Sequence, residues 1–263
     1  MHIVYFSPTG GTRKAAYIIG KEIDPQATEI DITDHTRQQN SYELNGEDTL
    51  LVAVPVYGGR VPSVAIDRLK RITGHNTPAI LVVVYGNRDY DDALIELRDI
   101  LENNGLHTIA AGAFVGEHSF SRILAKDRPD MKDMDIVDEF VRKICEKYKT
   151  DTLSHPIPVS GTPYPYRGYY TPRDRQGTPV DIRKVKPLTN DRCNNCKHCA
   201  KVCPMGSISY ENVRELTGIC IKCGACIKKC PKQAKYYEDT GYLYHQHELE
   251  EGLTRRAENT FFI

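Results

Sequence analysis

The sequence predicts an α/β domain built on a doubly wound parallel sheet, joined to a small α+β domain that is rich in cysteine. Apolar, strand-like segments alternate with amphipathic helical segments through residues 1–150. Eight of the nine cysteines lie between Cys193 and Cys230. Proline and tyrosine are concentrated between these two regions. We therefore divide the chain into a first domain over 1–150, a linker arm over 151–186, a cysteine-rich domain over 187–236 and a C-terminal extension over 237–263.

The first domain is expected to contain five strands and four helices. The strands are expected at residues 2–6, 28–32, 49–54, 79–85 and about 107–115, and the helices at 12–23 and about 63–73, 91–104 and 134–148. Continuous apolar strands separated by helices are typical of a parallel sheet that is covered on both faces. A ligand loop after the first strand suits the strand order 2-1-3-4-5, in which ligands bind beyond the carboxyl ends of the strands.

The turn between the first strand and the first helix has the residues of a phosphate site. Hydroxyl and glycine residues gather there, at a helix N-terminus whose free N–H groups and dipole favour an anion. The turn lacks the lysine of a nucleoside triphosphate loop and the G-x-G-x-x-G of a dinucleotide loop, so a phosphate monoester suits it better. An ordinary strand-to-helix turn is the alternative. The candidate contacts are Ser7, Thr9, Gly10, Gly11 and Thr12.

Two further loops are expected at the same edge of the sheet, after the third and fourth strands. Their glycines allow the backbone to approach the edge of a flavin ring, and Tyr57 or Tyr90 could stack on the face of the ring. The alternative is that these tyrosines only cover the loops. The candidate contacts are Pro55, Val56, Tyr57, Gly58 and Gly59 from one loop, and Tyr85, Gly86, Asn87, Arg88 and Tyr90 from the other.

The clustered cysteines form two copies of the pattern C-x2-C-x2-C-x3-C-P, 27 residues apart. This spacing is that of proteins with two [4Fe-4S] clusters, in which the fourth cysteine of each run binds the other cluster. A zinc site would leave the third cysteine of each run unexplained, and disulfides would need an oxidising compartment. The pattern assigns Cys193, Cys196, Cys199 and Cys230 to one cluster, and Cys220, Cys223, Cys226 and Cys203 to the second. The ninth cysteine, Cys145, lies in an apolar stripe of helical period and is expected in the core.

Through SPTGGT, PVYGG and YGNRDY, residues 1–150 resemble flavodoxins, and residues 187–236 resemble bacterial 2×[4Fe-4S] ferredoxins. The combination is similar to the flavodoxin-ferredoxin fusion proteins of anaerobic bacteria. The resemblance implies a flavodoxin-like fold, FMN rather than FAD, two [4Fe-4S] clusters and a role in electron transport. Arg88 departs from single-domain flavodoxins because it brings a cation close to the expected flavin, which leaves the direction of electron flow open.

The two remaining segments are expected to pack on the chain itself. The arm has many prolines, which stiffen it, and its tyrosines are unlike a disordered tether. We expect it to lie on the first domain and to position the clusters. The C-terminal extension is expected to form a helix near 246–258 and to tuck its apolar end, Phe261-Phe262-Ile263, against the chain. His245 and His247 are expected at the surface.

Charge and the absence of other motifs narrow the function. Residues 1–150 hold 18 Lys and Arg against 23 Asp and Glu, whereas residues 184–235 hold 11 against 3. The basic domain could therefore dock on the acidic one or on an acidic redox partner. No motif supports nucleic-acid binding. No signal peptide and no membrane span are found, so a cytoplasmic protein is expected.

Three functions suit these features. The first is an electron relay in which FMN exchanges electrons with the two clusters, and the clusters with partner proteins. The second is a flavin-dependent reductase of a small molecule, fed through the clusters, with Arg60, Arg88 or His118 as substrate contacts. The third is a redox sensor that uses the clusters as a switch. The sequence leaves open whether the protein is an enzyme.

Overall fold

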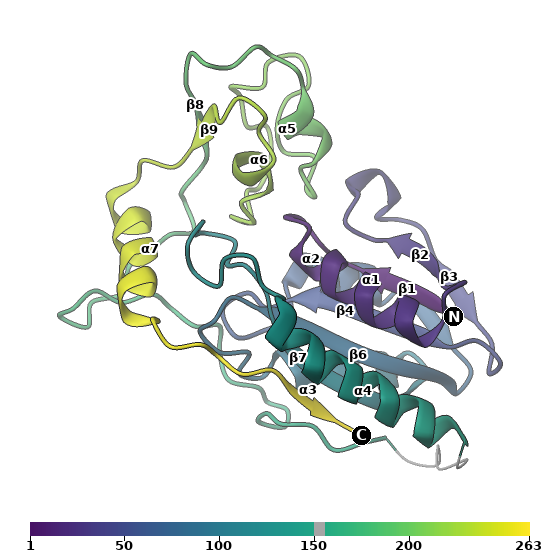
Figure 1. The fold of residues 1–263 in the computed structure, drawn as a ribbon. Helices are drawn as coiled ribbons and strands as arrows, with labels where there is room; N and C mark the ends of the chain where they lie inside the picture. Colours follow the sequence, from purple (N-terminus) through teal and green to yellow (C-terminus); the bar gives the residue numbers. More distant parts are fainter. Residues whose placement is uncertain (150–155) are drawn as a thin grey trace.

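A six-stranded sheet forms the centre of the first domain in the computed structural model, which describes residues 1–149 and 156–263 (Figure 1). Five strands are parallel: β1 (His2–Tyr5), β2 (Thr28–Asp31), β4 (Leu50–Pro55), β6 (Thr77–Tyr85) and β7 (Leu106–Val115). Their order is β7-β6-β4-β1-β2, so the predicted order 2-1-3-4-5 and the predicted fold class are confirmed. The boundary expected between residues 150 and 151 lies outside the described residues.

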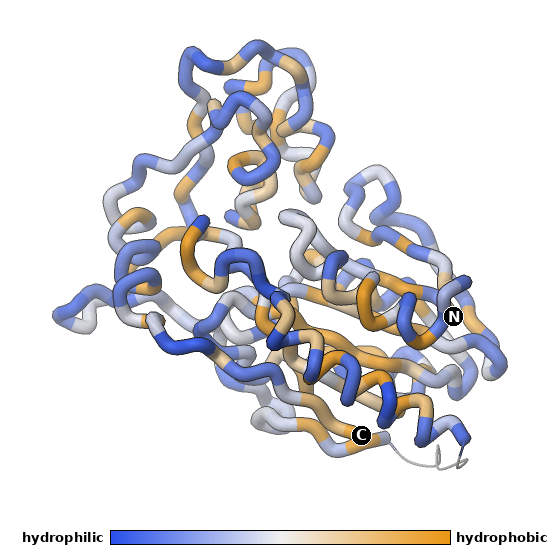
Figure 2. Tube along the Cα trace, in the orientation of Figure 1, coloured by the Kyte–Doolittle hydropathy of each residue, from blue (hydrophilic) through white to orange (hydrophobic). Residues whose placement is uncertain are grey.

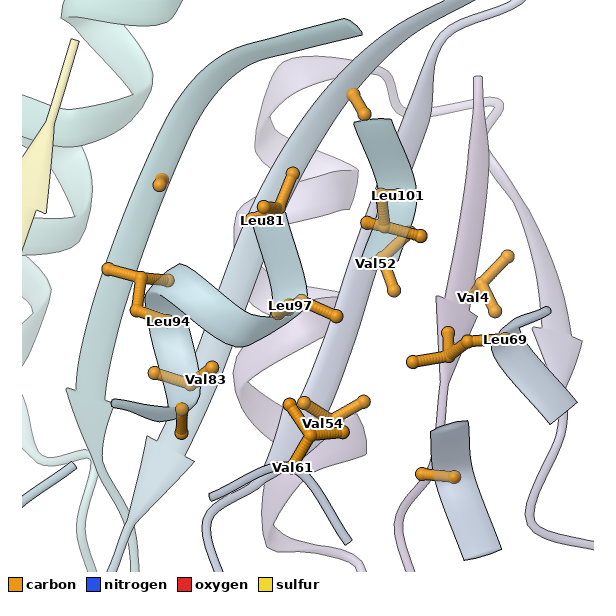
Figure 3. Close-up of a cluster of buried hydrophobic side chains, with 14 of the residues drawn as sticks. Val4, Val52, Val54, Val61, Leu69, Leu81, Val83, Leu94, Leu97 and Leu101 are labelled. Atoms are coloured by element: carbon orange, nitrogen blue, oxygen red, sulfur yellow. The ribbon is translucent and has the colours of Figure 1, made fainter. Parts of the chain in front are cut away.

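Helices cover both faces of this sheet because strand side chains alternate between the faces. On one face, α1 (Gly11–Ile23) and α4 (Met131–Lys149) pack on Ile3, Leu51 and Ile80. On the other, α2 (Ser63–Leu69) and α3 (Ala93–Asn103) pack on Val4, Val52 and Leu81, which are paired across neighbouring strands (Figure 3). The most hydrophobic residues accordingly lie along the strands of the sheet (Figure 2).

Two predicted helices differ clearly from those observed, and three short elements of the first domain were not predicted. The helix expected over 63–73 ends at Leu69, because the next residues form β5 (Ile72–Gly74), which pairs in parallel with β3 (Tyr42–Leu44). A short 3-10 helix, η1 (His35–Arg37), precedes β3. The helix expected near 246–258 is α7 (Thr240–Gly252), six residues earlier. Its N-cap is Asp239, whose carboxylate accepts a hydrogen bond from the Tyr242 N–H at 2.8 Å, and this capping signal is visible in the sequence.

The apolar C-terminus is tucked against the first domain, as expected, and it also extends the sheet. Its last residues form β10 (Thr260–Phe262), which pairs antiparallel with the edge strand β7. Phe261 packs against Phe140 of α4 with ring centroids 5.4 Å apart. Cys145 also packs against this apolar cluster, as its position in the helical stripe predicts. The edge of the sheet is therefore covered by the same chain.

The cysteine-rich domain repeats one backbone conformation at an interval of 27 residues. It contains β8 (Leu188–Thr189) and β9 (Lys235–Tyr236), which pair antiparallel, and the single-turn helices α5 (His198–Lys201) and α6 (Ala225–Lys228). The backbone is left-handed at three equivalent pairs: Asn195 and Lys222, Lys197 and Gly224, Gly206 and Gln233. Three of these six are glycine or asparagine, the residues that adopt this conformation most readily. The duplication seen in the cysteines therefore extends to the fold.

The described part of the arm lies along α3 and the loops beside it. The buried carboxylate of Asp92 accepts hydrogen bonds from the Thr162 N–H, at 2.8 Å, and from the backbone and guanidinium of Arg167. The Tyr166 hydroxyl donates to Asp99 at 2.7 Å. The Tyr169 hydroxyl donates to a backbone carbonyl in the loop after β4 at 3.0 Å. The tyrosines thus attach the arm to the first domain.

Candidate functional site

The predicted phosphate loop joins β1 to α1, and there is free space beside its backbone at the start of the helix. Gly10 has a φ of 103°, a left-handed conformation that favours glycine. A side-chain carbon built on Gly10 or Gly11 would meet no atom within 4 Å. The Ser7 hydroxyl accepts a hydrogen bond from the helix at 2.9 Å, whereas Thr9 and Thr12 have no side-chain hydrogen bond within the described residues. The loop therefore fits a phosphate held by N–H groups and hydroxyls.

The loop after β4 makes a tight turn beyond the last strand residue, Pro55. The backbones of Tyr57 and Arg60 exchange hydrogen bonds of 2.9 and 3.2 Å, and Gly58 and Gly59 between them have φ values of 56° and 80°. This double left-handed turn requires glycine. A side-chain carbon on Gly59 would also lie 2.3 Å from an Asp91 oxygen.

The loop after β6 is largely occupied by the C-terminal extension. The Tyr85 hydroxyl donates to the Glu258 carbonyl at 2.5 Å, and the Asn87 amide donates to two carbonyls of residues 253–255. The Tyr90 hydroxyl meets Thr260 at 3.2 Å. Because the Tyr85 hydroxyl and the Asn87 amide are bonded, these two residues can offer a flavin only backbone atoms or a ring face, whereas the Tyr90 hydroxyl keeps its own proton. This use of the loop could not be read from the loop sequence alone.

Arg88 and His118 line one large cavity, but Arg60 does not belong to it. The cavity has a volume of about 740 Å³ and lies between the loops after β4, β6 and β7, the arm, α7 and the second cysteine run. Its lining includes Val56, Tyr57 and Gly58. The Arg60 guanidinium pairs instead with Glu96 at 2.5 Å and lies 4.7 Å from the Tyr166 ring centre. The arm and α3 hold the Arg60 side chain outside the lining of this cavity, so its role as a substrate contact stays a prediction.

Two neutral histidines face the cavity. Burial, followed by the nearby cations Lys228 and Arg88, lowers the pKa of His118 to about 4, and burial lowers the pKa of His245 to about 4 as well. Both rings are therefore uncharged at neutral pH. The His118 Nδ1 accepts a hydrogen bond from the Phe120 N–H at 3.1 Å, which leaves the ring proton on Nε2. His245 is buried, contrary to its expected surface position, whereas the His247 side chain is exposed.

The eight clustered cysteines line two small cavities, four to each. Cys193, Cys196, Cys199 and Cys230 line one, and Cys203, Cys220, Cys223 and Cys226 line the other. The fourth cysteine of each run therefore sits with the other run, which is the grouping that the spacing predicts. Within the described residues, no three His, Cys, Asp or Glu side chains gather as ligands of a single metal ion.

Backbone donors and an apolar lining make these cavities fit sulfur-rich clusters. The Ser207 N–H donates to the Cys203 sulfur at 3.4 Å, and the equivalent Ala234 N–H donates to the Cys230 sulfur at 3.2 Å. Such bonds stabilise thiolates and tune cluster potentials. The cavity of the second run is also lined by isoleucines and by Tyr237, whose buried hydroxyl has no hydrogen-bond partner in the described residues.

The second cysteine run is packed on the first domain. Lys228 of α6 pairs with Glu117 and donates to the His118 carbonyl at 2.5 Å, both in the loop after β7. On the other side, the buried Arg68 guanidinium donates to the Pro204 carbonyl at 2.5 Å and to carbonyls after β2. Acidic and basic groups therefore meet across this contact, as the uneven charge of the sequence suggests.

One residue joins the two sites. Ile221, between Cys220 and Cys223, lines both the 740 Å³ cavity and the cavity of the second cysteine group. Burial raises the pKa of the Tyr57 phenol well above its usual value, and the charges of Cys223 and Cys220 raise it further. The expected flavin loop and the second cysteine group are therefore near neighbours.

Comparison with known proteins gives a family for the cysteine-rich region. Residues 192–235 match the family model described as a 4Fe-4S dicluster domain. The chain thus has a flavodoxin-like sheet in its first domain, and its cysteine-rich region is similar to 4Fe-4S dicluster domains, a name used for that region below. A search of curated proteins returned no match. Across the residues that the structure describes, no helix is both long and apolar enough to span a membrane.

Three solved structures are similar to the flavodoxin-like domain. A flavodoxin of Streptococcus pneumoniae is 16% identical, with 56% of this chain and 97% of that one covered and a TM-score of 0.40. A flavodoxin of Fusobacterium nucleatum bound to flavin mononucleotide is 13% identical, with coverages of 57% and 96% and a TM-score of 0.37. An apo NADH:FMN oxidoreductase is 16% identical, with coverages of 62% and 96% and a TM-score of 0.40.

The phosphate loop generates a first prediction. Thr9→Ala removes a hydroxyl that has no other hydrogen-bond partner among the described residues. Since a hydrogen bond to a charged group contributes roughly 1.5–3 kcal/mol, FMN affinity should fall by about one to two orders of magnitude. Riboflavin, which lacks the phosphate, serves as the control ligand and should bind as before. Titration of flavin fluorescence measures both, and equal losses would place the phosphate elsewhere.

The grouping of the cysteines in the dicluster domain generates a second prediction. Cys203→Ser should perturb the cluster that Cys220, Cys223 and Cys226 share with it, and should leave the spectrum of the other cluster intact. Cys230→Ser is the matched variant one repeat later and should have the opposite effect. Electron paramagnetic resonance of the two reduced variants distinguishes the clusters. Loss of the same signal in both variants would contradict the grouping.

Proposed function

We propose that this protein carries electrons within one chain, between FMN in the flavodoxin-like domain and two [4Fe-4S] clusters in the dicluster domain, and exchanges them with a partner protein. The observation that carries the proposal is the shared lining residue Ile221, which separates the expected flavin cavity from the second cysteine group. FMN accepts one or two electrons, whereas each cluster accepts one. Together, the flavin and the clusters can therefore divide a two-electron transfer into single-electron steps.

The first domain supplies the groups that would hold FMN. The Ser7–Thr12 loop offers N–H groups, the helix dipole and two hydroxyls to the phosphate. The loops that carry Tyr57 and Arg88 would border the ring, at the carboxyl edge of the sheet where ligands of this fold bind. Arg88 would place positive charge beside the ring, although its pairing with Asp91 offsets part of that charge.

The dicluster domain supplies the groups that would hold the two clusters. Each of the two cavities offers four thiols and backbone N–H donors to sulfur. The contacts of Lys228 and Arg68 fix the second cavity against the first domain. Thiols that serve as cluster ligands must stay reduced, which agrees with a cytoplasmic location.

A second function, reduction of a small molecule at the flavin, has one specific observation in its favour. The cavity of about 740 Å³ is large for a pocket that holds only the ring of a flavin. His118 offers an Nε2 proton to a molecule in that cavity, and Arg88 offers a cation. Turnover of a small molecule without a partner protein would favour this function over the relay.

The relay generates a third prediction, about exchange within one molecule. In protein loaded with FMN and clusters, a laser flash that adds one electron to the flavin should be followed by reduction of a cluster, seen in its absorbance. The rate should not change on tenfold dilution, because the partners belong to one chain. A rate that rises with protein concentration would show that the two sites serve different molecules.

Replacement of the arm extends the same measurement. A Gly/Ser segment in place of residues 162–172 removes the hydrogen bonds of the Arg167 guanidinium to Asp92 and of the Tyr166 hydroxyl to Asp99. It should slow the exchange, since fewer molecules have the domains docked. Tyr164→Ser is the control, because the Tyr164 side chain in the same segment is exposed. An arm variant that exchanges electrons at the native rate would remove the positioning role of the arm.

A further inference from the structure

The two halves of the dicluster domain have the same backbone but different surroundings. In the second run, Cys223, Gly224 and Cys226 are buried, and a side-chain carbon on Gly224 would lie 2.7 Å from the Ser119 carbonyl oxygen of the first domain. In the first run, the equivalent loop is open and Cys196 is exposed. The first cysteine group is therefore the one that faces away from the flavodoxin-like domain.

Basic side chains surround this open loop. Arg192 is exposed and donates at 2.7 Å to the carbonyl of Gln233, the residue that follows the exposed Lys232. Lys197 and Lys232 line the first cysteine cavity together with Cys196. In Figure 2, the end of this domain that lies away from the sheet is accordingly coloured mainly as hydrophilic.

The first domain does not neutralise these charges. Its acidic groups meet the other side of the dicluster domain, where Lys228 pairs with Glu117. Within residues 184–235, only three acidic residues accompany 11 basic ones, and one of the three, Asp191, is paired with Arg214 at 3.3 Å. A positive rim therefore remains around the exposed cluster loop.

We propose that this rim, formed by Arg192, Lys197 and Lys232, is the docking surface for an acidic one-electron carrier protein. The proposal rests on the proposed function, and it deepens it by assigning the external exchange to the cluster of Cys193, Cys196, Cys199 and Cys230. One electron passes between that cluster and the carrier; no covalent bond is formed or broken, and no proton is transferred. Opposite charge would steer the encounter and raise its rate at low salt.

The test compares two small electron acceptors of opposite charge, acidic plastocyanin and basic cytochrome c, with the fully loaded chain reduced by dithionite. Stopped-flow mixing at low salt should give faster reduction of plastocyanin, and the rate should fall as salt is added. The double variant Arg192→Glu, Lys232→Glu should slow plastocyanin reduction by about tenfold or more. The control variant Lys132→Glu, Lys143→Glu carries the same charge change on α4 and should behave as the native protein.

Two outcomes would overturn the docking surface. They are equal native rates for the two acceptors and equal effects of the two double variants. The flash experiment on the same samples measures internal exchange independently. If internal exchange persists while the charge variants have no effect, the docking surface falls and the relay stands.

A separate observation concerns Tyr237. Its hydroxyl is buried without a partner among the described residues, and its side chain lines the cavity of the second cysteine group. The same cavity is lined by Cys203, Cys220, Cys223 and Cys226. One repeat earlier, the equivalent Tyr210 is exposed and its ring lies 5.8 Å from the Lys197 ammonium.

We infer that the Tyr237 hydroxyl donates a hydrogen bond to a sulfur of the cluster held by Cys203, Cys220, Cys223 and Cys226. Burying a hydroxyl without a partner is costly, and a sulfur in this cavity would supply the acceptor. A hydrogen bond to a cluster sulfur stabilises the more negative, reduced state and raises the reduction potential. The equivalent Tyr210 has no such role, so the two clusters differ in potential although their ligands repeat.

The experiment is a redox titration of the loaded chain, followed by electron paramagnetic resonance. Tyr237→Phe removes only the oxygen and should make one cluster harder to reduce by about tenfold, or about 59 mV for one electron. Tyr210→Phe is the matched control and should leave both potentials unchanged. Unchanged potentials in Tyr237→Phe, or equal shifts in both variants, would overturn the inference. Failure of the native chain to hold a second cluster would instead count against the proposed function.

Discussion

The arrangement of this protein depends on the contact between the second cysteine run and the carboxyl edge of the parallel sheet. Lys228 makes this contact by donating to the His118 carbonyl. Beside it, Arg68 donates to the carbonyl of Pro204, which follows Cys203, the member of the same cysteine group that comes from the first run. Burial lowers the pKa of Lys228, and the Glu117 carboxylate opposes that shift, so the charge is kept by its partner. Because ligands of this fold bind at the same edge, the contact places a cysteine group beside the expected flavin.

The same contact breaks the symmetry of a duplicated domain. Two runs with one spacing and one backbone conformation would have the same chemistry in isolation. Docking buries the second run, with Ile221 turned to the large cavity, and leaves Cys196 of the first run exposed. An order of sites therefore follows from burial: the large cavity, the buried group, and then the open group with its basic surroundings.

The arm and the C-terminal extension complete the site from outside the flavodoxin-like domain. The extension adds β10 to the sheet and accepts hydrogen bonds from the Asn87 amide. The arm donates hydrogen bonds to Asp92 and Asp99. Tyr170 of the arm and His245 of α7 line the cavity. The cavity thus belongs to four parts of the chain, which explains why a single-domain flavodoxin sequence is an incomplete guide to it.

The sequence by itself determined the strand order and the cysteine grouping, and it predicts the phosphate loop, because each depends on local spacing: apolar periodicity, the C-x2-C-x2-C-x3-C-P runs, and glycines at a helix start. Tertiary structure decided the rest. His245 is buried and Arg60 is held by Glu96, although neither position has a local pattern that predicts this. Which cysteine run borders the large cavity could not be predicted from the sequence either, because two equal repeats carry no signal of which one docks. That choice is made by contacts between residues more than 100 positions apart, such as Lys228 and Glu117.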